Sequence, residues 1–82
     1  MKVQVLFFAS LREALGSAGE ALELTAGADV AAARVLLASR SGEWQRLASP
    51  RIRAAVNQAL VAESHALAEG DELAFFPPVT GG

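Results

Sequence analysis

Residues 72–82 read ELAFFPPVTGG, an apolar run followed by two prolines and, at the end of the sequence, by two glycines. The apolar run has the composition of a β-strand. The two prolines lack backbone N–H donors and hold φ near the polyproline value, so the sheet cannot continue past them. We therefore expect a folded domain over residues 1–76 and an extended, flexible tail over residues 77–82.

The tail is suited to enter a narrow site of another protein. Six extended residues reach roughly 20 Å, and glycines without a Cβ pass through a channel that would exclude other residues. The α-carboxylate of the last residue would be the most accessible carboxyl group of the molecule. The residues expected to enter the partner are Pro77, Pro78, Val79, Thr80 and Gly81, and Gly82 follows as the reactive end.

The terminal carboxylate needs chemical activation before it can act as an acyl donor. It is ionised at neutral pH, and adenylation by ATP is the usual route to an activated acyl group. The sequence contains neither a G-x-x-x-x-G-K phosphate loop nor a G-x-G-x-x-G fingerprint. We therefore expect this chain to bind no cofactor and ATP to be used by an activating partner.

Composition narrows the function classes further. The chain has 82 residues, a formal net charge of −2, one histidine and no cysteine. The acidic balance argues against nucleic acid and against an anionic membrane as partners. The lack of cysteine excludes disulfides, thiolate nucleophiles and persulfides, and a single histidine argues against a self-contained metal site. The apolar start is too short for a signal peptide and no run approaches the ~20 residues of a membrane span, so we expect a cytoplasmic protein.

Periodicity predicts two helices and five strands. The strands are expected over residues 2–8, 20–25, 52–56, 59–61 and 72–76, and the helices over residues 10–15 and 30–40. Ser10 and Glu13 have the spacing of a capping box for the first helix, and Asp29 is the expected N-cap of the second. Asn57-Gln58 has the character of a tight reversal between two strands.

These elements favour an α+β domain of two layers. The alanine-rich second helix carries the apolar stripe Val30, Ala33 and Leu37, which would cover one face of a mixed sheet. The first and last strands are apolar enough to be parallel neighbours in its centre. If their alternate apolar residues face the helix, then Phe8, Leu60 and Phe76 point to the other face. Such an apolar group marks a partner surface, unless the short first helix and the loops cover it.

The ending from Gly70 to Gly82 resembles that of the small subunits of molybdopterin synthase, which are sulfur carriers of the MoaD/ThiS family. Further matches are Val5-Leu6-Phe7-Phe8-Ala9 followed by Arg12-Glu13, and Ala54-Ala55-Val56-Asn57-Gln58 followed by Leu60-Val61. The resemblance covers nearly the whole chain and is most specific in the final eight residues. It implies the ubiquitin-like β-grasp fold: a mixed five-stranded sheet with one main helix packed on one face, followed by the Gly-Gly tail.

The resemblance also implies a reaction cycle for the Gly82 carboxylate. An E1-like adenylyltransferase would convert it to an acyl-adenylate, a sulfur donor protein would convert that to a thiocarboxylate, and the large synthase subunit would use the sulfur on a pterin precursor. By the same resemblance, Phe8, Leu60 and Phe76 match the family's docking surface. The catalytic side chains are expected on the large subunit of a heterotetramer, so that this chain is a carrier and not an enzyme by itself.

Two other functions remain open at this level. One is a related carrier for thiamin thiazole synthesis or tRNA thiolation. The other is a ubiquitin-like modifier or a plain interaction module. A modifier would become linked to lysines of target proteins, whereas a plain module would keep its activity without Gly82.

Some polar and aromatic residues carry no clear assignment. His65 and Trp44 are interpreted as a solvated loop residue and as a core or rim anchor, with an interface role as the alternative for the tryptophan. The basic residues Arg46, Arg51 and Arg53 form a solvated face or meet an acidic partner. The acidic residues Glu69, Asp71 and Glu72 lie at a turn and a strand start, which argues against acid–base catalysis.

Overall fold

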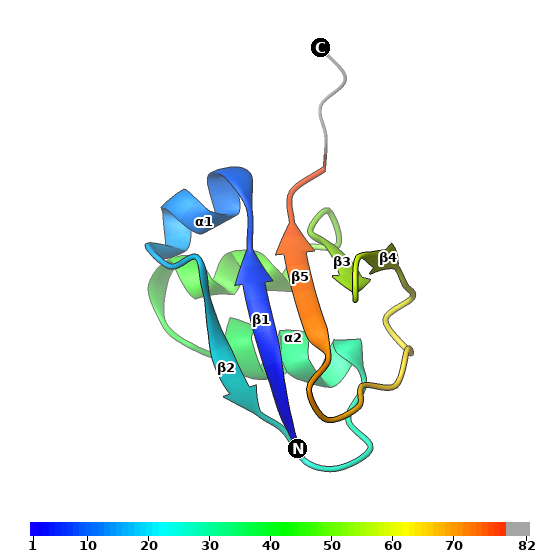
Figure 1. Cartoon of the computed structure of the whole chain (residues 1–82). Helices are drawn as coiled ribbons and strands as arrows, with labels where there is room; N and C mark the ends of the chain where they lie inside the picture. Colours follow the sequence, from blue (N-terminus) through cyan, green and yellow to red (C-terminus); the bar gives the residue numbers. More distant parts are fainter. Residues whose placement is uncertain (79–82) are drawn as a thin grey trace.

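The computed structural model describes residues 1–78 of the chain (Figure 1). Its elements are β1 (Lys2–Phe7), α1 (Ala9–Leu15), β2 (Gly19–Glu23), α2 (Val30–Ala38), the 3-10 helix η1 (Gly42–Ala48), β3 (Arg53–Val56), β4 (Ala59–Leu60) and β5 (Glu72–Phe76). The five strands form one sheet in the order β2-β1-β5-β3-β4. β1 and β5 are parallel and the other neighbours are antiparallel, which confirms the predicted mixed sheet.

The centre of the sheet is formed by the two strands that the sequence predicted there. β1 and β5 run side by side in the same direction (Figure 1), and Val5 pairs with Leu73 and Phe7 with Phe75. All four side chains are fully buried. Because parallel strands end at the same edge, α1 and the residues after β5 lie together at that edge.

α2 packs against one face of the sheet and closes the core. Asp29 caps the helix as predicted, since its Oδ1 accepts a hydrogen bond from the N–H of Ala32 at 2.9 Å. The predicted stripe Val30, Ala33 and Leu37 is completely buried against the sheet. The helix ends at Ala38, before the predicted end at residue 40, and the chain then turns away into η1.

α1 starts differently from the prediction. The N–H of Phe8 donates to the carbonyl of Phe75 at 3.2 Å, so pairing with β5 continues one residue beyond β1. The chain then bends sharply at Ala9, whose φ is 54°, and the helix begins there. Phe8 occupies the N-cap position without a side-chain hydrogen bond, so the predicted capping box of Ser10 and Glu13 is wrong.

The remaining elements lie close to their predicted positions. Asn57 and Gln58 both adopt positive φ, at 49° and 72°, which confirms the tight reversal between β3 and β4. β4 is shorter than predicted, and β2 starts and ends earlier. Trp44 of η1 is half-buried and meets the ring of Phe7 edge to face at a centroid distance of 5.4 Å. This confirms its interpretation as an anchor of the core.

Arg34 joins three segments of the chain, a role that no sequence pattern indicated. Its side chain is only 11% exposed and forms a two-pronged ion pair with Glu63, at 2.8 and 3.0 Å. The same guanidinium donates to the carbonyls of Leu47 at 2.8 Å and Ile52 at 2.7 Å. One arginine on α2 therefore fixes η1, the start of β3 and the segment after β4.

Residues 1–78 contain neither a candidate membrane-spanning helix nor a candidate metal site. In that range no helix has the length and apolar character needed to cross a membrane. Nor does it hold a group of histidine and acidic side chains that could bind a metal ion.

Candidate docking surface

A hollow lies on the sheet face that points away from α2, and we call it the docking hollow. Its volume is about 460 Å³, and it is lined by Leu6, Phe8, Ala55, Gln58, Leu60, Glu72, Ala74 and Phe76. The three apolar residues that the sequence placed on this face are all among them. The structure therefore brings these three together, although they come from three separate parts of the chain.

The large apolar residues of the docking hollow remain accessible. Leu60 is 66% exposed and Phe8 is 45% exposed, whereas Phe76 is half-buried. α1 and the loops therefore do not cover this face, which was the alternative interpretation of the pattern. Exposed apolar groups of this size on a small domain indicate a surface that binds a partner.

The floor of the docking hollow consists of small residues, and sequence patterns identify only part of it. Ala55 and Ala74 lie opposite one another on β3 and β5, and both are buried beneath their larger neighbours. Two facing alanines leave a depression between bulkier side chains on either side. Ala74 precedes Phe76 by two residues on β5, so the alternation that places Phe76 on this face places Ala74 there too. Only the pairing of β3 with β5 brings Ala55 next to it.

The residues that follow β5 begin at the edge of the docking hollow. Pro77 is half-buried and lines a small cleft of about 220 Å³ together with Arg46, Arg51 and residues of α1. Pro78 is exposed. The predicted tail residues Val79, Thr80, Gly81 and Gly82 lie outside the described residues.

The acidic turn before β5 has a structural role. The side-chain amide of Asn57 donates to Asp71 Oδ1 at 3.0 Å, and the N–H of Ala68 donates to Oδ2 at 2.8 Å. These hydrogen bonds hold the pKa of Asp71 below its ordinary value. Asn57 also accepts from the N–H of Glu72 at 3.0 Å, so the reversal after β3 is joined to the start of β5.

The remaining polar candidates are on the surface. His65 is exposed in the loop before β5. Arg46 forms an ion pair with Glu43, one turn earlier in η1. Arg51 and Arg53 are exposed, as expected for the basic face.

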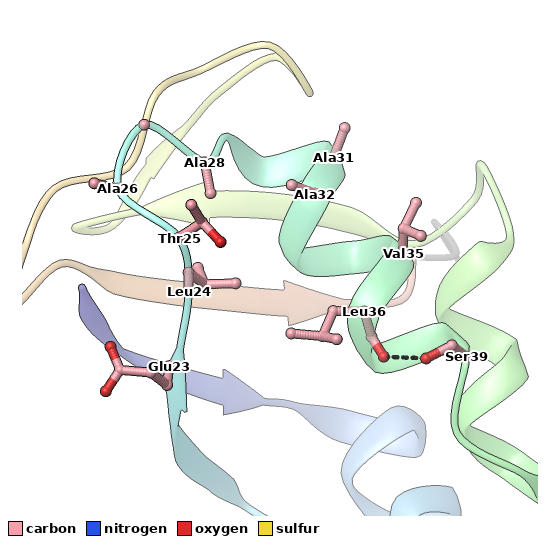
Figure 2. Close-up of a pocket in the computed structure, with 11 residues that line it drawn as sticks. Glu23, Leu24, Thr25, Ala26, Ala28, Ala31, Ala32, Val35, Leu36 and Ser39 are labelled. Carbon is pink, nitrogen blue, oxygen red and sulfur yellow. Dashed lines mark hydrogen bonds between the residues drawn. The ribbon is translucent and has the colours of Figure 1, made fainter.

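A second apolar hollow lies on the helix side of the molecule, between α2 and the chain that follows β2. Figure 2 shows Val35 and Leu36 along this groove of about 800 Å³. Among the described residues that line it, Glu23 alone has an ionisable side chain, and the amino group of Met1 pairs with that carboxylate at 2.8 Å. The docking hollow is the better candidate site, because Phe76 at the end of β5 lines it and the expected tail follows Phe76 in the sequence.

The topology defines the class of protein. A mixed sheet with its first and last strands parallel in the centre, crossed on one face by one main helix, is the ubiquitin-like β-grasp. The sequence profile of the ThiS family matches residues 5–82. The chain therefore belongs to the ThiS family.

Individual relatives agree with this assignment. The molybdopterin synthase sulfur carrier subunit of Escherichia coli is 48% identical, over 98% of this chain and 99% of that protein. The crystal structure of SAMP1 from Haloferax volcanii superimposes with a TM-score of 0.81 at 32% identity and covers both chains completely. A complex of subunits 1 and 2 of the molybdopterin-converting factor from Helicobacter pylori contains a chain with a TM-score of 0.73 and 25% identity, again over the full length of both.

Proposed function

We propose that this chain is the sulfur carrier of molybdopterin synthase, its small subunit, in the synthesis of the molybdenum cofactor. The observation that carries the proposal is the exposed docking hollow at the edge from which the residues after β5 depart. A carrier needs such a surface beside its reactive end, so that a partner can hold the domain while it receives the tail. Membership of the ThiS family and the similarity to the carrier subunit of E. coli support it.

The reactive group in this proposal is the α-carboxylate of Gly82. One carboxylate oxygen attacks the α-phosphorus of ATP on an E1-like adenylyltransferase, and pyrophosphate leaves. Hydrosulfide, released by a sulfur donor protein, then attacks the acyl carbon, and AMP leaves with the oxygen, so that a thiocarboxylate remains. Neither step uses a cofactor bound to this chain.

The thiocarboxylate is then presented to the large subunit. Phe8, Leu60 and Phe76 dock against it, while Pro77, Pro78, Val79, Thr80 and Gly81 thread toward its catalytic side chains. The sulfur passes to the pterin precursor, water takes its place on the acyl carbon, and the carboxylate is restored. The complex of subunits 1 and 2 from H. pylori supports a partner of this kind. We place the cycle in the cytoplasm and the subunits in a heterotetramer.

Intact-mass measurement tests the charging step. The protein is incubated with the activating enzyme, ATP and a sulfur source, and we expect the mass gain of one oxygen replaced by one sulfur at the C-terminus. A variant that lacks Gly82 is the control and should gain nothing. An unchanged mass under conditions that charge the E. coli carrier subunit would contradict the proposal.

A second measurement separates the carrier pathways. The charged protein is mixed with the large subunit and the pterin precursor, and we expect molybdopterin to form. If the charged protein instead supplies sulfur only to thiazole synthesis or to tRNA thiolation, the chain is a carrier of another pathway.

A modifier function is the second candidate, because SAMP1 of H. volcanii, named a small archaeal modifier protein, has the same fold at 32% identity. A modifier becomes linked through its C-terminal carboxyl group to lysine side chains of other proteins. Blots of native cells for this chain should then show species of higher mass that resist denaturation. We expect only the free chain.

A further inference from the structure

The two ends of the docking hollow carry opposite charges, and the proposed function makes no use of this difference. The register of β3 with β5 sets Ala55 opposite Ala74 and Arg53 opposite Phe76. Residues paired in this way point to the same face of a sheet. Because Ala55, Ala74 and Phe76 line the docking hollow, the register assigns the exposed Arg53 to the same face, at the edge where β5 ends. There it also borders a neighbouring cleft that Ile52 and Glu63 line.

Arg51 adds a second positive charge at this edge. It lines the small cleft that also contains Pro77, the last half-buried residue of the chain among those described. Within residues 1–78 the ion pairs of the molecule occupy Arg34, Arg40 and Arg46, and neither Arg51 nor Arg53 takes part in one. Both guanidinium groups therefore remain able to pair with a partner.

The opposite end of the docking hollow is acidic. Glu72 lines its rim, four residues before Phe76 on the same strand and therefore about 13 Å away along the sheet. Glu69 and Asp71 lie beside it in the preceding turn. Charges in solvent are largely screened beyond the Debye length of about 8 Å at physiological ionic strength, so the two ends do not neutralise one another.

We propose that Arg51 and Arg53 orient the large subunit on the docking hollow by pairing with carboxylates around the entrance that receives residues 79–82. This inference rests on the proposed function. Burial of apolar surface is non-directional and would permit the partner to bind in several rotations. Only one rotation places the channel over the end of β5, and complementary charges at an interface select orientation and accelerate encounter.

The charge pattern favours a protein surface with separated charges over a polyanion. A uniformly negative partner such as nucleic acid would meet Glu72 on the same face and be repelled there. A large subunit with an acidic entrance and a basic patch at the far rim satisfies both ends at once.

The association rate with the large subunit from the same organism tests the inference. We compare Arg53→Glu with Lys2→Glu, because both change the net charge equally and both residues are exposed. Lys2 lies at the start of β1, where Glu69 accepts a hydrogen bond from its backbone N–H, and so belongs to the acidic end. We expect Arg53→Glu to lower the association rate constant about tenfold at low salt, with the difference vanishing at high salt, and Lys2→Glu to leave it unchanged or raise it.

The possible outcomes separate a failure of the orienting role from a failure of the proposed function. If Arg53→Glu binds as fast as the parent chain, or if both variants slow binding equally, the orienting role is overturned while the carrier function stands. A third variant, Leu60→Asp, monitors docking itself. If Leu60→Asp also leaves the affinity unchanged, the docking hollow is not the interface, and both the orienting role and the proposed docking step fail.

Discussion

Gly19 begins β2 at a point where β1 leaves no space for a side chain. A Cβ at this position would lie 2.3 Å from the carbonyl oxygen of Val5, a backbone atom that cannot rotate away. Gly16 has the left-handed φ of 66° at the end of α1 but open space around it. Gly16 is therefore required by backbone conformation alone, whereas Gly19, whose φ is 158°, is required by close approach as well.

Substitution separates these two reasons. Gly19→Ala should lower the free energy of unfolding by roughly 2–3 kcal/mol, in the upper part of the range for point mutants, because β1 and β2 must move apart. Gly16→Ala is the matched control and should cost about 1 kcal/mol, for a left-handed residue without a clash. Urea unfolding measures both, and equal losses would contradict the close approach.

Glu20 of β2 and Arg40, two residues after the end of α2, form a two-pronged ion pair. The distances are 2.6 and 2.8 Å, and the guanidinium also lies over the ring of Trp44 at 4.5 Å. The hydrogen bond from Arg40 lowers the pKa of the Glu20 carboxyl below its ordinary value. A lowered pKa in the folded state means that the pair stabilises the fold above the unfolded pKa of about 4.5.

This stabilisation should disappear as the pH falls through the folded pKa of Glu20. Both side chains are partly exposed, at 29% and 38%, so the contribution is expected to stay below about 1 kcal/mol. Glu20→Gln should therefore reduce stability at pH 7 and flatten the loss of stability below pH 4.5. The midpoint of thermal unfolding, measured between pH 3 and 7, tests this. A midpoint that falls as steeply below pH 4.5 in Glu20→Gln as in the unchanged protein would contradict the prediction.

At the scale of elements, the reversal between β3 and β4 combines a good turn residue with a poor one. Asn57 tolerates its positive φ, and its side chain bonds to Asp71 and Glu72. Gln58 also adopts a positive φ, of 72°, which non-glycine residues adopt only at a cost of about 1–2 kcal/mol. A two-residue turn with both φ values positive prefers Asn-Gly.

Gln58→Gly should therefore stabilise the protein. The relief of strain exceeds the entropy that glycine adds to the unfolded chain, and we expect a net gain of roughly 0.5–1 kcal/mol. Asn57→Gly is the control and should destabilise, because it removes the hydrogen bonds to β5. Urea midpoints measure both changes, and a loss of stability in Gln58→Gly would show that its side chain has another role.

At the scale of the whole molecule, two apolar hollows lie on opposite sides of the sheet. The docking hollow contains Leu60, which is 66% exposed, and the groove beside α2 contains Val35, which is 68% exposed. The two residues are therefore matched in exposure and differ in the face that they occupy. This pair allows a test of which face binds the large subunit.

Leu60→Asp should weaken the affinity for the large subunit at least about tenfold, as expected for a residue near the centre of an interface. Val35→Asp should leave the affinity unchanged, because it lies on the far side of the sheet. Isothermal titration with the large subunit measures both affinities. The opposite ranking would move the interface to the helix side.

Much of this architecture could be predicted from local patterns. The period of two in residues 2–8 and 72–76, the cap at Asp29 and the stripe on α2 each depend on neighbours within a few residues, and all of them are found in the structure. Alternation alone also placed Phe8, Leu60 and Phe76 on one face. The start of α1 escaped prediction, because it depends on a hydrogen bond from Phe8 to the distant β5.

Strand pairing decided the remaining features of the site. Ala55 and Ala74 form the floor of the docking hollow only because β3 and β5 pair in one register, and the same register brings Arg53 beside Phe76. Arg34 acquires its role from carbonyls of segments that are remote in sequence. Periodicity reports which way a side chain points, whereas its neighbours across the sheet follow from long-range pairing, and no local pattern contains that information.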